Sequence, residues 1–260
     1  MSRIVPFGQY IPGDTPVHRA DARAKLAAIA AITFALFGSS GWFGIVLVAI
    51  VVIASYKIAR IHLRHALRGL RPILLLLAFM LVVHSFGRVP GGSLWEIGFS
   101  GAGLLRGLYF AARIALLISA TSLLTYTTSP VALTDALVTL MRPLARIGIP
   151  VEDIAMMFSI ALRFIPTTAE DAERIMVAQS ARGARFDSGG PFKRMRAFST
   201  ILIPLFVSLF RRADDLAVAM ESRGYTGVKR TRLNQARFTG MDATIVVAAI
   251  TLATIAVVFG

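Results

Sequence analysis

The fold of this chain is decided by two stretches in its second half, PVEDIAMMFSIALRFIPTTAEDAERIMVAQSARG at residues 150–183 and PFKRMRAFSTILIPLFVSLFRRADDLAVAMESRG at residues 191–224. In the first, apolar side chains recur at helical spacing, and charged side chains occupy much of the remaining surface. Each stretch starts with a proline, which the first turn of a helix tolerates, and ends in Arg-Gly. We therefore expect two long amphipathic helices, the first kinked or restarted at Pro166 and the second bent at Pro204.

The ends of the two stretches match, since Ala181-Arg182-Gly183 and Ser222-Arg223-Gly224 lie forty-one residues apart. A Gly directly after a helix can adopt the left-handed conformation, and an Arg at the helix end answers the partial negative charge of the terminal carbonyls. One such ending is ordinary, whereas two predict matched helix tips presented to a two-fold partner. Because Arg can bind a carboxylate through two parallel hydrogen bonds, which Lys cannot reproduce, the partner should carry acidic groups.

The rest of the chain has the composition of an integral membrane protein. Of 260 residues, 56% are hydrophobic and only 16% are charged, and the mean hydropathy is +0.69. There is no Cys, and the four His are dispersed, so neither a disulfide nor a metal site is expected. A net charge of +14 would suggest nucleic acid in a soluble protein. Here the basic residues flank apolar segments, so positive-inside topology and anionic lipid headgroups explain the charge, and no nucleic-acid partner is expected.

The apolar segments predict five membrane spans. A spanning helix needs about 20 mostly apolar residues, and the first two segments are shorter, so they form either a tilted hairpin or one long helix. The predicted spans are residues 26–37, 42–56, 72–86, 104–126 and 243–259.

Charge asymmetry selects a topology. Residues 57–71 carry one Lys and four Arg without an acid, whereas residues 87–100 carry only Arg88 against Glu96. The former segment is therefore expected in the cytoplasm and the latter outside. The basic N-terminal segment also belongs inside, which favours the hairpin and an external C-terminus.

The sequence thus predicts an all-α membrane protein with four parts. These are a cytoplasmic N-terminal segment at residues 1–25, transmembrane helices 1–4 at 26–127, a cytoplasmic coupling domain at 128–240 and transmembrane helix 5 at 241–260. Within the coupling domain, residues 201–210 are apolar but too few to span. They are expected to lie along the membrane interface or beneath another apolar protein.

No enzymatic site is predicted. The acidic pairs Glu152-Asp153 and Asp214-Asp215 are adjacent in sequence, which points their members to different sides of a helix and weakens a magnesium and diphosphate site. A phosphate-binding loop and a Gly-x-Ser-x-Gly nucleophile are both missing. A membrane-bound lipid-modifying enzyme is therefore disfavoured, and no catalytic, cofactor-binding or metal-binding residue is expected.

Two polar residues within the spans keep an alternative open. Arg113 and His84 would be the functional groups of a stand-alone secondary transporter or channel. The structural interpretation of Arg113, in which it bonds to neighbouring carbonyls, is favoured. A substrate pathway normally shows more polar groups than these two, which argues against a self-sufficient transporter.

Several motifs together resemble the T component of energy-coupling-factor transporters, the transmembrane scaffold of a vitamin-importing, ATP-driven complex. The likeness covers nearly the whole chain. It rests on Gly8-Gln9-Tyr10 with His18, Asp21, Arg23 and Lys25; residues 127–137; Arg142-Pro143-Leu144; Leu162-Arg163-Phe164-Ile165-Pro166; Ala178-Gln179-Ser180-Ala181-Arg182-Gly183; and Ala219-Met220-Glu221-Ser222-Arg223-Gly224-Tyr225.

The resemblance implies a function and partners. The two small-Arg-Gly tips are expected to dock into grooves on two ABC-type ATPase subunits, which would bind the ATP and Mg of the complex, so this chain needs no cofactor. A membrane-embedded, substrate-binding S component would sit on the apolar side of the crossing helices, in a prokaryotic cell membrane. Met side chains suit exchangeable partners. The residues expected to contact the S component are Met156, Met157, Ile201, Leu205, Phe206 and Phe210.

Overall fold

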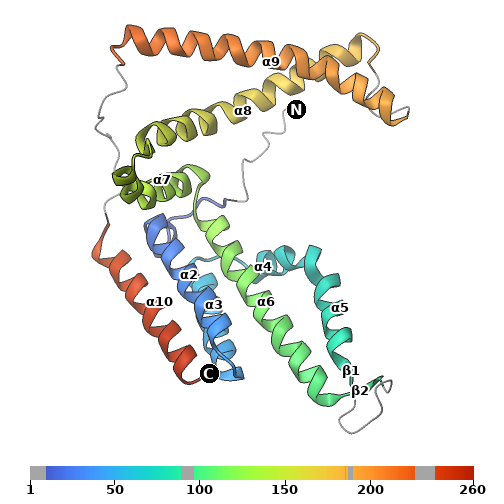
Figure 1. Cartoon of the computed structure of the whole chain (residues 1–260), viewed down its shortest axis with the longest axis vertical. Coiled ribbons are helices and arrows are strands. Elements are labelled where there is room, and N and C mark those ends of the chain that lie inside the picture. The colour runs from blue at the N-terminus through green and yellow to red at the C-terminus, as the bar shows by residue number, and fades with distance from the viewer. Residues whose placement is uncertain (1–9, 89–96, 185, 187–189, 226–237) are drawn as a thin grey trace. The chain divides into compact units, whose positions relative to one another are not determined.

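A computed structural model describes residues 10–88, 97–184, 186, 190–225 and 238–260. The chain forms two compact units (Figure 1). Unit 1 comprises Met1–Leu137 together with Gln235–Gly260, and unit 2 comprises Val138–Asn234. In the sequence, unit 2 therefore lies between the first part of unit 1 and the last helix of unit 1.

Unit 1 is built of helices joined by short turns, with a pair of three-residue strands. Its helices are α1 (Pro16–Arg19), α2 (Ala22–Gly38), α3 (Trp42–Ile58), α4 (Leu63–Leu70), the 3₁₀ turn η1 (Arg71–Ile73), α5 (Leu74–Ser85), α6 (Gly101–Thr127) and α10 (Gly240–Val258). The strands β1 (Phe86–Arg88) and β2 (Ile97–Phe99) pair antiparallel between α5 and α6. Helix α7 (Pro130–Met141) contains the boundary between the units.

The described helices match the predicted all-α membrane protein. Three helical stretches are long and apolar enough to cross a bilayer: Arg64–Ser85, Gly101–Thr127 and Gly240–Val258. Helix α3 is apolar but has only 17 residues. Helix α2 also has 17 residues. Residues 39–41 between α2 and α3 are not helical, so the two are separate helices and not one long helix.

Unit 1 is held together by close approach of helices through small residues. Helix α2 packs on α10, α3 and α6, and the buried side chains of Leu36, Val48, Tyr56 and Ala256 form the centre of this packing. A Cβ added at Gly44 would lie 2.5 Å from the Cβ of Ser39, so only glycine allows this approach. The Tyr56 hydroxyl donates to the Ser119 carbonyl at 2.9 Å, which satisfies a polar group deep in the bundle.

Arg113 of α6 is bonded to the end of α2. Its Nη2 donates to the Ser39 carbonyl at 2.8 Å, and the guanidinium lies 4.7 Å from the centre of the Tyr109 ring. Ser39 is the C-cap of α2, so the charge faces the negative end of a helix dipole. The half-buried Arg113 therefore has a structural partner, as the favoured interpretation expected.

The described part of unit 2 contains the end of α7, the 3₁₀ turn η2 (Arg142–Ile147) and two long helices, α8 (Val151–Ala181) and α9 (Pro191–Ser222). Pro166 and Pro204 lie inside α8 and α9. Pro191 is the first residue of α9, whereas Pro150 is the N-cap of α8 and so precedes its first turn. The sequence therefore predicts both helices closely, because prolines and glycines bound them.

Candidate docking site at two helix tips

The end of α8 is a glycine-terminated helix cap. Ala181 is the last helical residue, Arg182 is the C-cap, and Gly183 has φ +90°. The Gly183 N–H donates to the Ser180 carbonyl and the Ala184 N–H donates to the Gln179 carbonyl, both at 3.0 Å. This is the Schellman arrangement, in which the left-handed glycine satisfies the last carbonyls of the helix.

The end of α9 repeats this geometry. Arg223 is the C-cap after Ser222, and Gly224 has φ +74°. The Gly224 N–H donates to the Glu221 carbonyl at 2.9 Å and the Tyr225 N–H donates to the Met220 carbonyl at 3.0 Å. The left-handed glycine predicted for each tip is thus confirmed, and the two tips are the same structure built twice.

Gly183 and Gly224 are needed for the backbone conformation at the helix ends and not for close packing against another segment. A Cβ added at Gly183 or Gly224 would have no atom within 4 Å. The φ values alone exclude most other residues, because a Cβ disfavours the left-handed region. Open space at each tip also means that a partner surface can approach the backbone closely.

The two arginines are presented outward. Arg182 and Arg223 are both exposed, and the ion pairs found between described residues involve neither of them. An exposed guanidinium that is not engaged in such an ion pair can bind a carboxylate through two parallel hydrogen bonds. The tips therefore have the geometry and the free donors that an acidic groove on a partner would need.

Helices α8 and α9 cross each other, and in Figure 1 their C-terminal ends lead away from the crossing to different sides. Between the two helices, Arg212 Nη2 of α9 lies 2.6 Å from Asp171 Oδ2 of α8. The Arg212 guanidinium also lies 5.7 Å from the centre of the Phe164 ring. Sequence reasoning treated Asp171 as part of a solvated face and missed this pair, because helical periodicity does not identify a partner on another helix.

The residues expected to contact an S component are not equally accessible. Met157, Phe206 and Phe210 are 67%, 56% and 69% exposed, whereas Met156 and Leu205 are half-buried. Ile201 is only 6% exposed, so it belongs to the packing of unit 2 and not to its surface. The prediction treated all ten residues of the apolar run 201–210 as one exposed surface, but a helix directs some of these side chains toward its neighbours.

Other apolar side chains enlarge this surface. A groove of about 510 Å³ lies on α9 and is lined by Ile203, Pro204, Val207, Ser208, Arg211, Arg212 and Asp215. Ile203 and Val207 are 66% and 47% exposed. Sequence analysis named neither residue, although both fall within the predicted apolar run. Exposed apolar surface of this kind on a helix pair is typical of a binding face for another apolar protein or for lipid.

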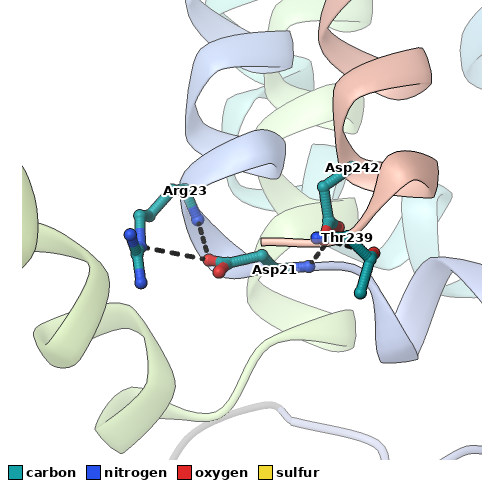
Figure 2. Close-up of polar contacts among 4 residues, drawn as sticks. All are labelled: Asp21, Arg23, Thr239 and Asp242. Carbon is teal, nitrogen blue, oxygen red and sulfur yellow. Dashed lines mark hydrogen bonds and ion pairs between the residues drawn. The ribbon is translucent and has the colours of Figure 1, made fainter. Parts of the chain in front are cut away.

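A second polar constellation anchors the start of α10 (Figure 2). Asp242 Oδ2 accepts hydrogen bonds from the Thr239 N–H at 2.8 Å and the Thr239 hydroxyl at 2.6 Å, which completes a capping box. Asp242 Oδ1 accepts from the Asp21 N–H at 2.7 Å. Asp21 in turn accepts from the Arg23 N–H at 2.9 Å, which begins α2. Residues at the starts of α2 and α10 are therefore bonded together where the chain returns to unit 1 after unit 2.

Lys25 extends this anchor to α6. Its Nζ donates to the Thr127 carbonyl at 2.9 Å and to the Thr128 hydroxyl at 3.2 Å, and the side chain is buried. A buried ammonium is tolerated because its hydrogen-bond donors are satisfied. Asp21, Arg23 and Lys25 belong to the motifs that resemble the family, but the sequence predicts no role for them. In the structure they bond the start of α2 to α10 and to the end of α6.

Comparison with known proteins places these features in a family. The family model CbiQ, described as Cobalt transport protein, matches residues 13–233. The Energy-coupling factor transporter transmembrane protein EcfT of Thermosediminibacter oceani is 44% identical over 92% of this chain and 92% of its own length. Proteins of the same name from Lactococcus lactis subsp. cremoris and Bacillus subtilis are 41% and 39% identical, over 94% and 95% of this chain and 93% and 95% of their own lengths.

The match includes α8, α9 and both tips, since residues 150–183 and 191–224 lie within the matched segment. It agrees with the resemblance drawn from the motifs alone. The chain therefore belongs to the CbiQ and EcfT family, the transmembrane T components of energy-coupling factor transporters.

Proposed function

We propose that this chain is the coupling subunit of an ATP-driven importer of vitamins or other micronutrients, and that it transmits motions of two ABC-type ATPase subunits to a substrate-binding S component. The observation that carries the proposal is the pair of matching, exposed helix ends at Arg182 and Arg223. Two copies of one tip on crossing helices suit a partner with two equivalent grooves.

The chemistry of each tip suggests how the ATPases bind. Each groove would present carboxylates to one guanidinium, and the open space around Gly183 and Gly224 lets the groove enclose the helix end. ATP binding would close the two ATPases and move the grooves toward one another. Because Arg182 and Arg223 end rigid helices, that motion would pass into α8 and α9. In this scheme ATP and Mg bind to the ATPases, and the chain itself holds no cofactor.

The exposed apolar surface of unit 2 supports a seat for the S component. Met157, Phe206 and Phe210 are each more than half exposed, and their burial against an apolar partner would be favourable by about 25 cal/mol per Å². Met side chains adapt to different surfaces. A tilt of α8 and α9 would then move or release the S component.

The proposed topology follows from the charge pattern. The N-terminal segment and residues 128–240 face the cytoplasm, and the C-terminus lies outside a prokaryotic cell membrane. This arrangement puts both tips on the side where ATP is available.

A stand-alone secondary transporter or channel is the alternative, with Arg113 and His84 as its functional groups. In the structure Arg113 is bonded to the Ser39 carbonyl, and His84 Nδ1 lies 2.9 Å from the Met80 carbonyl of its own helix. Both residues therefore have local partners, which supports structural roles for them.

Reconstitution separates the two functions. Proteoliposomes that contain the chain, ATPase subunits of an energy-coupling factor transporter and an S component should accumulate the substrate of that S component only when ATP is supplied. Proteoliposomes that contain the chain alone should show no flux. Substrate flux through the chain alone, without ATPases, would support the secondary transporter and contradict the proposal.

A further inference from the structure

The segment that joins α7 to α8 has apolar side chains on two sides, and only one side is used for packing. Val138 is buried and belongs to a small cluster within unit 2 that includes Val151. Leu140, Leu144 and Ile147, in contrast, are 53%, 37% and 75% exposed. The end of α7 and the turn η2 therefore keep three large apolar side chains outside the core of unit 2.

The three exposed side chains form a stripe. Leu140 and Leu144 are four positions apart, which suits one side of a helix. Leu144 and Ile147 both lie in the 3₁₀ turn η2, where side chains three positions apart are eclipsed. The turn ends at Gly148, which has φ +88°. The stripe is thus a short, continuous apolar surface that stops where the chain turns toward α8.

The same segment is basic. Residues 136–151 contain Arg142 and Arg146 and no Asp or Glu. Both arginines are exposed, and the ion pairs found between described residues involve neither of them. Exposed apolar side chains combined with basic ones are typical of a segment that lies in the surface of an anionic membrane.

The chain itself keeps this segment near a bilayer. Helix α6 is long and apolar enough to span and ends at Thr127. Helix α7 has 12 residues and is therefore about 18 Å long. The two residues before it, Thr128 and Ser129, add at most about 7 Å. Leu140 thus cannot lie further than about 25 Å from the end of a spanning helix, whether or not a protein partner is present.

We propose that residues 140–147, the membrane-contact segment, lie in the surface of the bilayer and bind anionic phospholipids. Leu140, Leu144 and Ile147 insert at the boundary between headgroups and acyl chains. Arg142 and Arg146 bind lipid phosphates, since a planar guanidinium can hold two phosphate oxygens at once. The contact attaches unit 2 to the membrane independently of ATPase subunits and of an S component, so it goes beyond the proposed function.

The absence of Cys from the sequence makes a direct test possible. A nitroxide is attached to Ile147→Cys of the full chain, and in a separate sample to Glu170→Cys, whose parent side chain is 65% exposed on α8. Each chain is placed singly in nanodiscs of phosphatidylglycerol. Collisions with oxygen, which concentrates in the bilayer, are compared with collisions with a water-soluble nickel chelate. The label at position 147 should be open to oxygen and shielded from nickel, and the label at position 170 should show the reverse.

Removal of charge tests the lipid specificity. Arg142→Gln and Arg146→Gln should each lower the ratio of immersed to water-exposed label at position 147 by about fivefold in phosphatidylglycerol, because each basic side chain is attracted to the anionic surface. Nanodiscs of phosphatidylcholine alone should lower the ratio of the parent chain in the same way. The matched control is Arg174→Gln, which removes an arginine that is 78% exposed outside the segment, and it should leave the ratio unchanged.

Three results would overturn the membrane contact. The first is a label at position 147 that nickel reaches as readily as it reaches position 170. The second is equal immersion in phosphatidylglycerol and phosphatidylcholine. The third is shielding that appears only after ATPase subunits or an S component are added, which would make the segment a protein interface. Failure of the chain to capture ATPases would contradict the proposed function but would leave the collision data on the chain alone unaffected.

Discussion

At the scale of single residues, the two tip glycines contribute through backbone conformation. Gly183→Ala and Gly224→Ala should each destabilise the last turn of their helix by about 1 kcal/mol, because alanine is unfavourable at φ +90° and +74°. Hydrogen exchange of the amides in the last turn of α8 or α9 measures this directly. Gly240→Ala is the matched control, since that position also has open space but no positive φ, and equal protection in all three variants would contradict the assignment.

The residue scale also shows where sequence reasoning is strong. The left-handed glycines and the exposed arginines at both tips are predictable because the helix-ending signal lies within a few residues. Ile201 was placed on the exposed face, and the structure buries it. Burial depends on which side of a helix faces its neighbour, and an uninterrupted apolar run does not reveal that side.

At the scale of helices, the anchor at the start of α10 should control the stability of unit 1. Asp242→Ala removes the acceptor of the Thr239 and Asp21 N–H groups. Loss of a helix cap costs about 1 kcal/mol and unmet buried donors add about 1–3 kcal/mol, so the thermal unfolding temperature of the purified chain should fall. Thr244→Ala should leave it unchanged, because that exposed hydroxyl bonds only within α10. An unfolding temperature equal to that of the parent would show that the anchor is dispensable.

The apolar face of α9 gives a second prediction at this scale. Phe206→Glu and Phe210→Glu should abolish capture of the S component while leaving capture of the ATPases intact, because each introduces a charge into a surface that an apolar partner would cover. Co-purification with tagged S component measures the effect. Ile201→Val, at the buried position, is the control and should retain capture. Full capture of the S component by both glutamate variants would show that the S component does not bind this face of α9.

Helix boundaries divide into those that the sequence predicts and those that it does not. Prolines and Arg-Gly endings bound α8 and α9 closely. The amphipathic α4 and the β1–β2 pair were not anticipated, because α4 has only eight residues and each strand only three, so a window of ten or more residues does not single them out. The capping box of Thr239 and Asp242 is a local signal that could have been read from the sequence, whereas the bond from the Asp21 N–H to Asp242 could not, because the two residues are 221 positions apart.

At the scale of the whole molecule, composition alone predicts a membrane protein, and the residues that the structure describes include three helical stretches of spanning length. Motif resemblance predicts the family, and the comparison with relatives confirms it. Long-range pairings such as Asp171–Arg212 and Asp21–Asp242 could not be predicted. A periodic pattern shows which side of a helix is polar, whereas its partner depends on packing across distant segments.

The proposed function requires the two tips to act as a pair, each holding one ATPase subunit. Native mass spectrometry of the chain co-expressed with the ATPases counts the bound subunits. We predict two per parent chain, fewer than two for Arg182→Glu and for Arg223→Glu, and none for the double variant, because each change replaces the guanidinium with a charge that an acidic groove repels. Arg174→Glu and Arg196→Glu, at exposed positions away from the tips, should keep two. Retention of two ATPase subunits by the double variant would contradict the account.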